Sequence, residues 1–211
     1  MQKIGVVFDC DGTLVDSEPL AGRAWAEVLE LYGYSITDED VRNVVGRTYA
    51  FTHSYLAERV QLPAPEALWR ELRGILFRLL DTQLKPFSDA VAAVADLQVR
   101  GVPLAVASSS VRERLDRTLA RAGLAFEVSI AGDEVEHGKP APDMFLAAAR
   151  RLDVDPARCV VVEDSPPGIA AGRAAGMPTL GVCRVEGTES TLAQADRIVH
   201  LVSAEAIMSL L

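Results

Sequence analysis

The sequence predicts an α/β fold built on a parallel β-sheet, with an all-helical segment inserted into it. Short apolar runs rich in β-branched residues recur along the chain, as is typical of strands buried on both faces. Helical patterns lie between these runs, and strands that alternate with helices indicate a parallel sheet. Residues 16–85 break the alternation, because this stretch contains helical patterns but no convincing strand.

The first expected strand covers residues 4–8, where Ile, Gly, Val, Val and Phe follow one another. Similar runs predict further strands at residues 103–107, 159–162, 179–182 and 197–200, with a weaker candidate at 127–131. The helices expected between them cover residues 88–100, 111–122, 143–152 and 168–175.

The inserted segment is expected to contain helices at residues 19–32, 38–45, 51–60 and 65–80. The first of these has an apolar stripe made of Trp25, Val28, Leu29 and Tyr32. We therefore expect a core domain of residues 1–15 and 86–211 and a helical cap domain of residues 16–85. An insertion at the carboxyl end of a strand is expected over the ligand-binding edge of the sheet, where a cap helps to choose the substrate.

The composition excludes several classes of protein. Hydrophobic residues make up 49% of the 211 residues, which is too many for a disordered chain. The net charge of −9 disfavours nonspecific binding to nucleic acid or to anionic membranes. No apolar run approaches the roughly 20 residues of a membrane helix, and the amino-terminal run is too short for a signal peptide. Three cysteines without disulfide or zinc spacing favour a reduced, cytoplasmic location.

Polar side chains follow three of the expected strands directly. Asp9 and Asp11 follow the first, Ser108 follows the second, and Glu163 and Asp164 follow the strand at 159–162. The carboxyl ends of parallel strands meet at one edge of a sheet, so these groups can converge. Four carboxylates in one crevice repel each other, and Mg²⁺ is the hard cation that suits such oxygen ligands.

Lys139 precedes a proline-rich stretch that opens a helix. Taken alone, it is an ordinary surface lysine. Beside a carboxylate–metal centre, it would supply the cation that a phosphate group needs and offset the charge of a nucleophilic carboxylate.

These residues, taken in order, resemble the four motifs of the haloacid dehalogenase superfamily. The pentapeptide at 9–13 is followed by Ser108, by Lys139 and by the Glu163–Asp164 pair. The surrounding stretches at 8–20, 137–145 and 161–177 are similar to the sugar-phosphate phosphatase and β-phosphoglucomutase branch of that superfamily, and the resemblance spans nearly the whole chain. It implies a Rossmann-like core with a cap, and Mg²⁺-dependent hydrolysis of a small phosphorylated metabolite such as a sugar phosphate.

The resemblance also implies roles for the first motif. Asp9 would attack phosphorus and form an aspartyl-phosphate, and Asp11 would protonate the leaving alcohol and then activate water. Gly12 would allow the backbone turn and Thr13 would sit beside the acid, and both would line the phosphate site.

The remaining motifs would complete the site. Ser108, Ser109 and Lys139 would bind the phosphoryl group, and Lys139 would also pair with the nucleophile. Asp164 would ligate Mg²⁺ together with Asp9 and the main-chain oxygen of Asp11, and Glu163 would ligate it directly or through water. The partner is then a small phosphorylated molecule, and the chain is expected to be a monomer or a weak homodimer.

The cap residues leave alternatives open. Arg47 is a candidate substrate contact, although Gly46 is equally well explained as a helix C-cap. A β-phosphoglucomutase would share every core motif, and Trp25 matches that branch. Ala21 and Tyr49 stand where mutases carry a histidine and a basic residue, which argues against one.

Two further alternatives are disfavoured. A haloacid dehalogenase needs no metal and usually lacks the second aspartate, so Asp11 and the Glu163–Asp164 pair argue against one. A non-enzymatic binding module has no need of the full set of motif residues.

Overall fold

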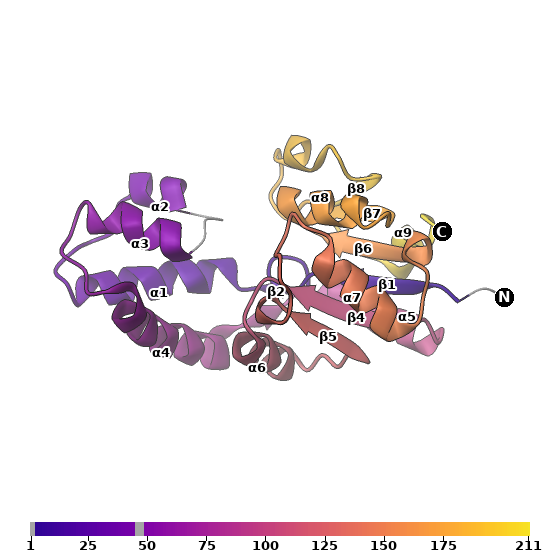
Figure 1. Cartoon of the computed structure of the whole chain (residues 1–211), viewed down its shortest axis with the longest axis horizontal. Coiled ribbons are helices and arrows are strands. Elements are labelled where there is room, and N and C mark those ends of the chain that lie inside the picture. Colours follow the sequence, from indigo (N-terminus) through magenta and orange to yellow (C-terminus); the bar gives the residue numbers. More distant parts are fainter. Residues whose placement is uncertain (1–2, 45–48) are drawn as a thin grey trace. The chain divides into compact units, whose positions relative to one another are not determined.

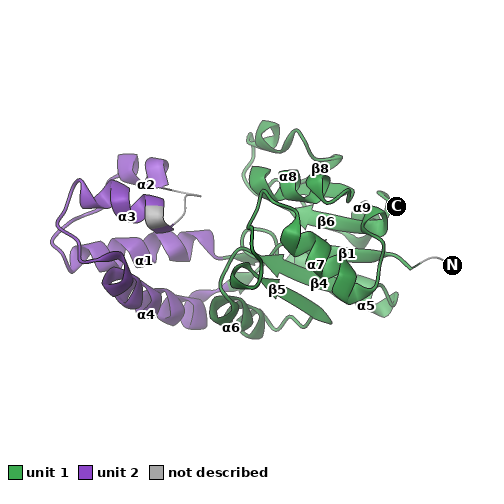
Figure 2. Ribbon diagram, viewed as in Figure 1, with its two compact units in different colours: residues 1–16, 85–211 green, residues 17–84 purple. Residues whose placement is uncertain are grey.

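The computed structural model describes residues 3–44 and 49–211 of the chain, which folds into two compact units (Figure 1). Unit 1 comprises Met1–Asp16 and Lys85–Leu211, and unit 2 comprises Ser17–Leu84 (Figure 2). The boundaries expected at residues 16 and 85 fall in two short antiparallel strands of unit 1, β2 (Val15–Asp16) and β3 (Lys85–Pro86).

Unit 1 is organised around a six-stranded parallel sheet with the order β5-β4-β1-β6-β7-β8. Its strands are β1 (Gly5–Phe8), β4 (Leu104–Ser108), β5 (Val128–Ala131), β6 (Cys159–Glu163), β7 (Thr179–Val182) and β8 (Arg197–Val199). The parallel sheet and its helical insertion confirm the predicted fold class. The weak candidate at 127–131 is an edge strand, which explains why its apolar pattern is the least continuous.

The central strand β1 is buried along its whole length and pairs with β4 on one side and β6 on the other. Phe8 is paired with Val106 of β4 and with Val162 of β6. Because the strands are parallel and in this register, the residues that follow β1, β4 and β6 all emerge at one edge of the sheet.

Helices cover both faces of this sheet (Figure 1). They are α5 (Ser88–Val99), α6 (Arg112–Ala122), α7 (Asp143–Leu152), α8 (Pro166–Ala174) and α9 (Ala204–Met208), with 3₁₀ turns η1 (Gly132–Glu134), η2 (Pro156–Arg158) and η3 (Glu189–Leu192). Helix α7 packs on β1, β4 and β5, where Met144 and Phe145 are buried against Val7 and Ala105. These apolar contacts supply much of the core of unit 1.

Helix α8 begins two residues before the predicted start at 168. The Ser165 side chain accepts a hydrogen bond from the Gly168 backbone N–H at 3.2 Å and so caps the helix. Pro166 and Pro167 then occupy the first turn, where the missing backbone N–H groups of proline cost nothing.

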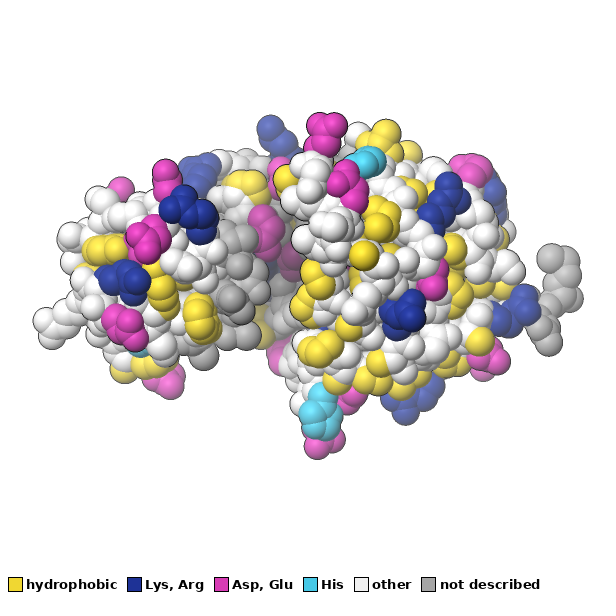
Figure 3. Space-filling view, turned by 90° about the horizontal axis from the view of Figure 1, so that it is seen from above, with side chains coloured by type: hydrophobic (Ala, Val, Ile, Leu, Met, Phe, Trp, Pro, Cys, Tyr) yellow, Lys and Arg dark blue, Asp and Glu magenta, His cyan; other side chains and the backbone are white. Residues whose placement is uncertain are grey.

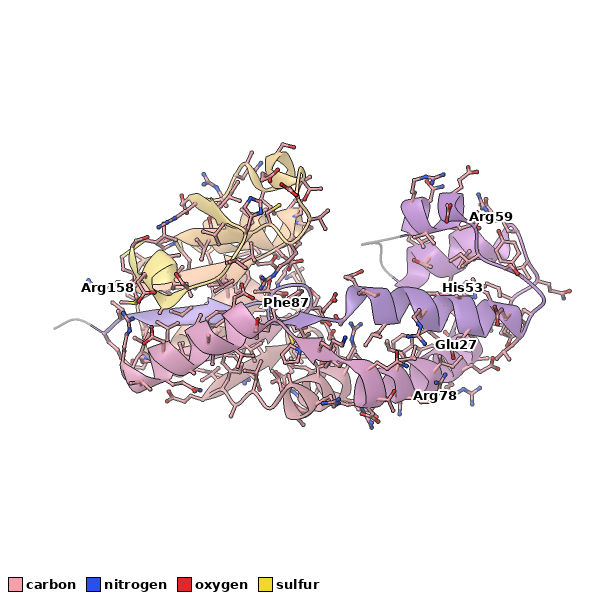
Figure 4. The ribbon with its side chains drawn as sticks, turned by 180° about the vertical axis from the view of Figure 1, so that it is seen from behind. Glu27, His53, Arg59, Arg78, Phe87 and Arg158 are labelled. Atoms are coloured by element: carbon pink, nitrogen blue, oxygen red, sulfur yellow. The ribbon has the colours of Figure 1, made fainter. Side chains whose placement is uncertain are left out.

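Unit 2 is entirely helical in the part that the structure describes. It contains α1 (Glu18–Glu30), α2 (Asp38–Val44), α3 (Tyr49–Ala57) and α4 (Pro65–Gln83). Helices α1 and α4 pack side by side through buried residues that include Val28 and Leu76. Glu27 of α1 and Arg78 of α4 form an ion pair across this contact (Figure 4). Helix α4 continues to Gln83, three residues past its predicted end.

A hydrogen-bonded carboxylate joins α2 to α3 in unit 2. Asp40 accepts hydrogen bonds from the Thr37 backbone at 2.9 Å and from the hydroxyls of Thr37 and Tyr34, both at 2.7 Å. Tyr55 donates to the other carboxylate oxygen at 3.2 Å, and Arg59 pairs with it at 3.0 Å. The polar network therefore fixes the approach of the two helices.

The charged surface is mixed. Lys and Arg side chains are interspersed with Asp and Glu side chains on the face seen in Figure 3. Within residues 3–44 and 49–211, none of the helices combines the length and the apolar character needed to cross a membrane.

Candidate active site

Three buried polar residues stand at the carboxyl ends of the central strands. Asp9 follows β1, Ser108 ends β4 and Glu163 ends β6. Their exposed fractions are only 6%, 1% and 1%, although polar side chains of these types are mostly exposed in proteins. Since β4 and β6 flank β1, the sheet itself brings these three groups together.

Lys139 joins two of them. It lies between β5 and α7, and its Nζ donates to Glu163 Oε1 at 2.7 Å and also to Asp9 Oδ1. A third hydrogen bond runs to the Ala107 carbonyl oxygen at 3.2 Å. The lysine side chain is only 5% exposed, so its charge is held by these partners rather than by water.

Burial and the neighbouring charges shift the pKa values of the ionisable groups in this cluster. Burial raises the pKa of Asp9 well above its ordinary value; Lys139 opposes this shift, and Glu163 and Asp164 add to it. Burial, followed by the charge of Glu163, raises the pKa of Asp164 to about 7. Burial lowers the pKa of Lys139, but the carboxylates of Asp9 and Glu163 outweigh it and raise that pKa above its ordinary value.

The cluster therefore holds more negative than positive charge. It contains the carboxylates of Asp9, Glu163 and Asp164 and the single ammonium of Lys139. Burial is the main cause of the raised pKa values of Asp9 and Asp164, and the neighbouring carboxylates add to both shifts. A divalent cation would compensate the excess negative charge. Hard carboxylate oxygens are the donor set of Mg²⁺, so the residues present fit that ion.

Gly12 brings the backbone of the first motif against Asp164. Its φ of +84° lies in the left-handed region that favours glycine, and a Cβ atom here would lie 2.1 Å from Asp164 Oδ2. Thr13 donates its hydroxyl to Asp164 Oδ1 at 2.8 Å. The loop after β1 thus fits closely around the carboxylate that follows β6.

Asp11 faces a different set of donors. Its Oδ2 accepts hydrogen bonds from Ser110 at 2.8 Å and from Ser108 at 3.3 Å, and its Oδ1 accepts one from Arg114 Nη2 at 2.7 Å. The two aspartates of the motif are therefore held separately, Asp9 by Lys139 and Asp11 by the serines and the arginine. Different partners suit them to different chemical roles.

Cys10 lies between these aspartates in sequence but is completely buried. Burial raises the pKa of its thiol well above the ordinary value, and the neighbouring charges of Asp11 and Asp9 raise it further. A thiol with a raised pKa is a poor nucleophile, so Cys10 is a packed side chain.

Comparison with known proteins identifies the family. The family model of the haloacid dehalogenase-like hydrolases matches residues 5–176. The chain belongs to the haloacid dehalogenase-like hydrolase family. This result confirms the resemblance found in the motifs.

Two named relatives of this haloacid dehalogenase-like hydrolase are phosphatases. Fructose-1-phosphate phosphatase YqaB of Escherichia coli is 36% identical over 184 residues, which cover 84% of this chain and 95% of the relative. The bifunctional riboflavin kinase/FMN phosphatase of Arabidopsis thaliana is 32% identical over 92% of this chain, which spans 52% of that relative's length. These names confirm the prediction that the chain is an enzyme of the hydrolase class.

A solved structure shows the same fold over nearly the whole chain. The haloacid dehalogenase-family hydrolase of Deinococcus radiodurans, determined with bound phosphate and sodium, is 31% identical and has a TM-score of 0.78. The similarity covers 99% of this chain and 95% of that one.

The structure of this hydrolase brings most of the predicted site residues into contact. Direct interactions join Asp9, Lys139 and Glu163, and others join Thr13 to Asp164 and Ser108 to Asp11. Ser109 is exposed, so the serine of this run that contacts Asp11 besides Ser108 is Ser110. Arg47 lies outside the described residues.

Three residues that lie against the predicted site residues were not themselves predicted from the sequence. Ser110 ends a run of three serines that starts at Ser108, and Arg114 lies in the first turn of α6, soon after β4. A cation in the first turn of a helix that follows a strand end is a usable, though weak, signal. Gly168 has no such signal in the sequence. In the structure it lies directly against Glu163, because a Cβ atom there would lie 1.7 Å from Glu163 Oε1.

Proposed function

We propose that this protein is a Mg²⁺-dependent phosphatase that hydrolyses a small phosphorylated metabolite, with Asp9 as the covalent nucleophile. The observation that carries the proposal is the buried contact of one ammonium, that of Lys139, with the carboxylates of Asp9 and Glu163. This arrangement presents a nucleophilic carboxylate beside a cation that can hold a phosphoryl oxygen.

In the first step, a carboxylate oxygen of Asp9 forms a bond to phosphorus as the bond from phosphorus to the alcohol oxygen breaks. Asp11 supplies the proton that the leaving alcohol takes up. In the second step, a water oxygen attacks phosphorus, the bond to Asp9 breaks, and Asp11 accepts the proton of that water. The products are the alcohol and inorganic phosphate.

The contacts of Asp11 support its part in both steps. Ser108, Ser110 and Arg114 orient its carboxylate, while Asp9 is oriented independently by Lys139. An acid–base group has to reach one oxygen after another, so its position relative to the nucleophile matters more than any single contact.

Mg²⁺ would be held by the carboxylates of Asp9 and Asp164 and the main-chain oxygen of Asp11, with Glu163 binding directly or through water. When bound, the ion supplies positive charge to the phosphoryl oxygens. Lys139 compensates part of the negative charge of the carboxylates. A divalent cation would compensate the rest.

We assign the substrate class as small phosphorylated metabolites, with sugar phosphates first. The names of the Escherichia coli and Arabidopsis relatives, a fructose-1-phosphate phosphatase and an FMN phosphatase, support this class. The residues proposed to bind the phosphoryl group are Asp9, Asp11, Gly12, Thr13, Ser108, Ser109 and Lys139, and Arg47 is proposed as a substrate contact.

The proposal is tested by phosphate release from a panel of phosphorylated metabolites, with Mg²⁺ or with EDTA. Release should require Mg²⁺ and should disappear in Asp9→Asn, because an amide oxygen is a poor nucleophile. The matched control is Asp116→Asn, a change on the exposed side of α6, which should leave turnover intact. Full turnover by Asp9→Asn, or full turnover in EDTA, would refute the mechanism.

A β-phosphoglucomutase is the competing activity within this family. Tyr49 stands where a basic residue is expected in that branch, and its ring stacks on Trp25 at 5.7 Å and meets Trp69 edge-on at 5.1 Å. These aromatic contacts give Tyr49 a packing role in unit 2, which supports the phosphatase. Conversion of β-glucose 1-phosphate that depends on glucose 1,6-bisphosphate would favour the mutase instead.

A further inference from the structure

A second group of metal-ligating side chains lies at the ends of the last two strands. Cys183 follows β7, His200 follows β8, and Glu189 begins η3 between them. The parallel pairing of these strands continues past β7, because the Cys183 backbone N–H donates to the Val199 carbonyl oxygen at 2.8 Å. In the sheet, β6 separates β7 from β1, so this group is distinct from the Asp9 cluster.

The three side chains bring their ligand atoms close together. The Cys183 sulfur, one imidazole nitrogen of His200 and one carboxylate oxygen of Glu189 all lie within 4.8 Å of one another. His200 Nε2 is 3.3 Å from Glu189 Oε1. Two tetrahedral ligands with bonds of about 2.0–2.1 Å to zinc lie about 3.3–3.4 Å apart, so this pair already has the required spacing.

A backbone carbonyl orients the imidazole. His200 Nδ1 is 3.2 Å from the carbonyl oxygen of Cys183, an acceptor that requires the proton to be on Nδ1. In the neutral ring, the Nε2 lone pair then faces the Glu189 carboxylate, and two acceptors at 3.3 Å need a cation or a proton between them. This orientation of a histidine by a carbonyl is common in metal sites.

The surroundings of the sulfur accept a thiolate. The Cys183 thiol donates to the Val185 carbonyl oxygen at 3.0 Å, and the Thr188 hydroxyl donates to the same oxygen at 2.7 Å. The Thr188 backbone N–H also donates to this oxygen, at 3.2 Å, so the carbonyl keeps a donor when the thiol loses its proton and the Thr188 hydroxyl turns away. The Thr188 oxygen is 3.4 Å from the sulfur, close enough for its hydroxyl to turn and stabilise a thiolate.

Solvent reaches this group from one side. Cys183 is 3% exposed, whereas the side chains of Glu189 and His200 are 39% and 57% exposed. A surface cavity of about 540 Å³ is lined by Cys183, His200 and Glu186. An ion can thus enter through the cavity, and a water molecule can complete a fourth position.

We propose that Cys183, Glu189 and His200 form a binding site for a thiophilic divalent transition metal of the Zn²⁺ class. Soft sulfur and imidazole ligands select this class, whereas the all-oxygen cluster around Asp9 selects Mg²⁺. The competing explanation is a simple ion pair between protonated His200 and Glu189. That pair accounts for the 3.3 Å contact between His200 and Glu189 but does not involve the Cys183 sulfur.

Cobalt provides the direct test, because a Co²⁺–thiolate bond gives a charge-transfer absorption band that oxygen ligands do not produce. The whole protein is titrated with Co²⁺ in excess Mg²⁺, and Zn²⁺ is then added as a competitor. We expect the band to form with one equivalent of Co²⁺ and to be removed by Zn²⁺. Cys183→Ser should abolish the band. His200→Asn and Glu189→Gln, which change exposed side chains, should weaken Zn²⁺ binding at least about tenfold.

Two control variants separate this site from other histidines and cysteines. Cys159→Ala removes a different buried thiol, and His137→Asn removes an exposed imidazole, so both should leave the band and the Zn²⁺ affinity unchanged. The proposal is overturned if no thiolate band appears, or if Zn²⁺ binding is the same in His200→Asn as in the unaltered protein. The readout is metal binding, so it is independent of phosphatase activity.

Discussion

Arg114 of α6 donates Nη2 to Asp11 Oδ1 at 2.7 Å, and both side chains are largely buried. The proposed acid–base group is thereby tied to a helix of the core unit. A helix is a more rigid support than the loop that carries Asp11 itself. The contact implies that Arg114 is a positioning residue for the proposed reaction.

Replacing Arg114 with Gln should therefore lower kcat about tenfold with little change in KM, a small part of the 10²–10⁴-fold that general acid–base catalysis contributes. Steady-state kinetics on the best substrate of the panel measure the effect. Arg121→Gln, in the last turn of the same helix, is the matched control and should retain normal kinetics. An unchanged kcat in Arg114→Gln would exclude the positioning role.

Lys139→Met should abolish phosphatase activity and destabilise the metal-free protein by about 3–5 kcal/mol, because it leaves buried carboxylates without their cation. Urea denaturation in EDTA measures the loss, and Mg²⁺ should restore part of it. The exposed Lys85→Met is the control for losing a lysine. Equal stability of the two variants would show that the Lys139 ion pairs contribute nothing.

Asp164→Asn should remove the stabilisation that Mg²⁺ gives to the folded protein. A ligand at 100 times its Kd stabilises a protein by about 2.7 kcal/mol, which raises the melting temperature. Thermal unfolding with and without Mg²⁺ should show this shift in the unaltered protein and in Asp116→Asn. A full shift in Asp164→Asn would remove this residue from the proposed ligands.

Gly168→Ala should displace the Glu163 carboxylate and reduce turnover. The added Cβ atom would lie 1.7 Å from Glu163 Oε1, and this carboxylate is held in place by Lys139 and by the Ser165 backbone N–H at 2.6 Å. Gly74→Ala is the contrasting case, because a Cβ atom there meets nothing within 4 Å. In the middle of α4, alanine should stabilise the helix by about 0.5–1 kcal/mol.

The two glycine variants are compared by urea denaturation and by phosphate release. Lower stability in Gly168→Ala together with equal or higher stability in Gly74→Ala is the expected pattern. Normal turnover by Gly168→Ala would mean that the Glu163 carboxylate tolerates displacement.

Unit 2 should show a pH dependence that comes from Asp40. Burial raises the pKa of this carboxyl, but hydrogen bonds from the Thr37 backbone and side chain, and then from Tyr34 and Tyr55, outweigh burial and lower the pKa to about 2. A folded-state pKa below the unfolded value stabilises the protein at neutral pH. This stabilisation, on the order of 2 kcal/mol, is lost as the pH falls from about 4 to about 2.

Asp40→Asn should accordingly be less stable than the unaltered protein at pH 7, with a difference that shrinks below about pH 4. Urea denaturation across this pH range provides the comparison. Asp38→Asn, an exposed change in the same helix, should not show it. A difference that is independent of pH would assign the effect to lost packing rather than to ionisation.

The sequence by itself determined the α/β class, the helical insertion and the position of the main carboxylates. These features depend on local periodicity and on chain order: a β-branched apolar run predicts a strand, and a residue that directly follows it emerges at the edge of a parallel sheet. Asp9, Ser108 and Glu163 could be placed together in this way, because strand ends need no knowledge of side-chain direction.

Only the tertiary structure decided which side chains meet beyond the strand ends. The pairing of Arg114 with Asp11 depends on how α6 is rotated about its axis, and the approach of Gly168 to Glu163 depends on where α8 begins. The meeting of Cys183 and His200 depends on β7 and β8 being neighbours in the sheet. Packing against the rest of the protein sets helix rotation and strand order. No local sequence pattern therefore predicts which distant residues come together.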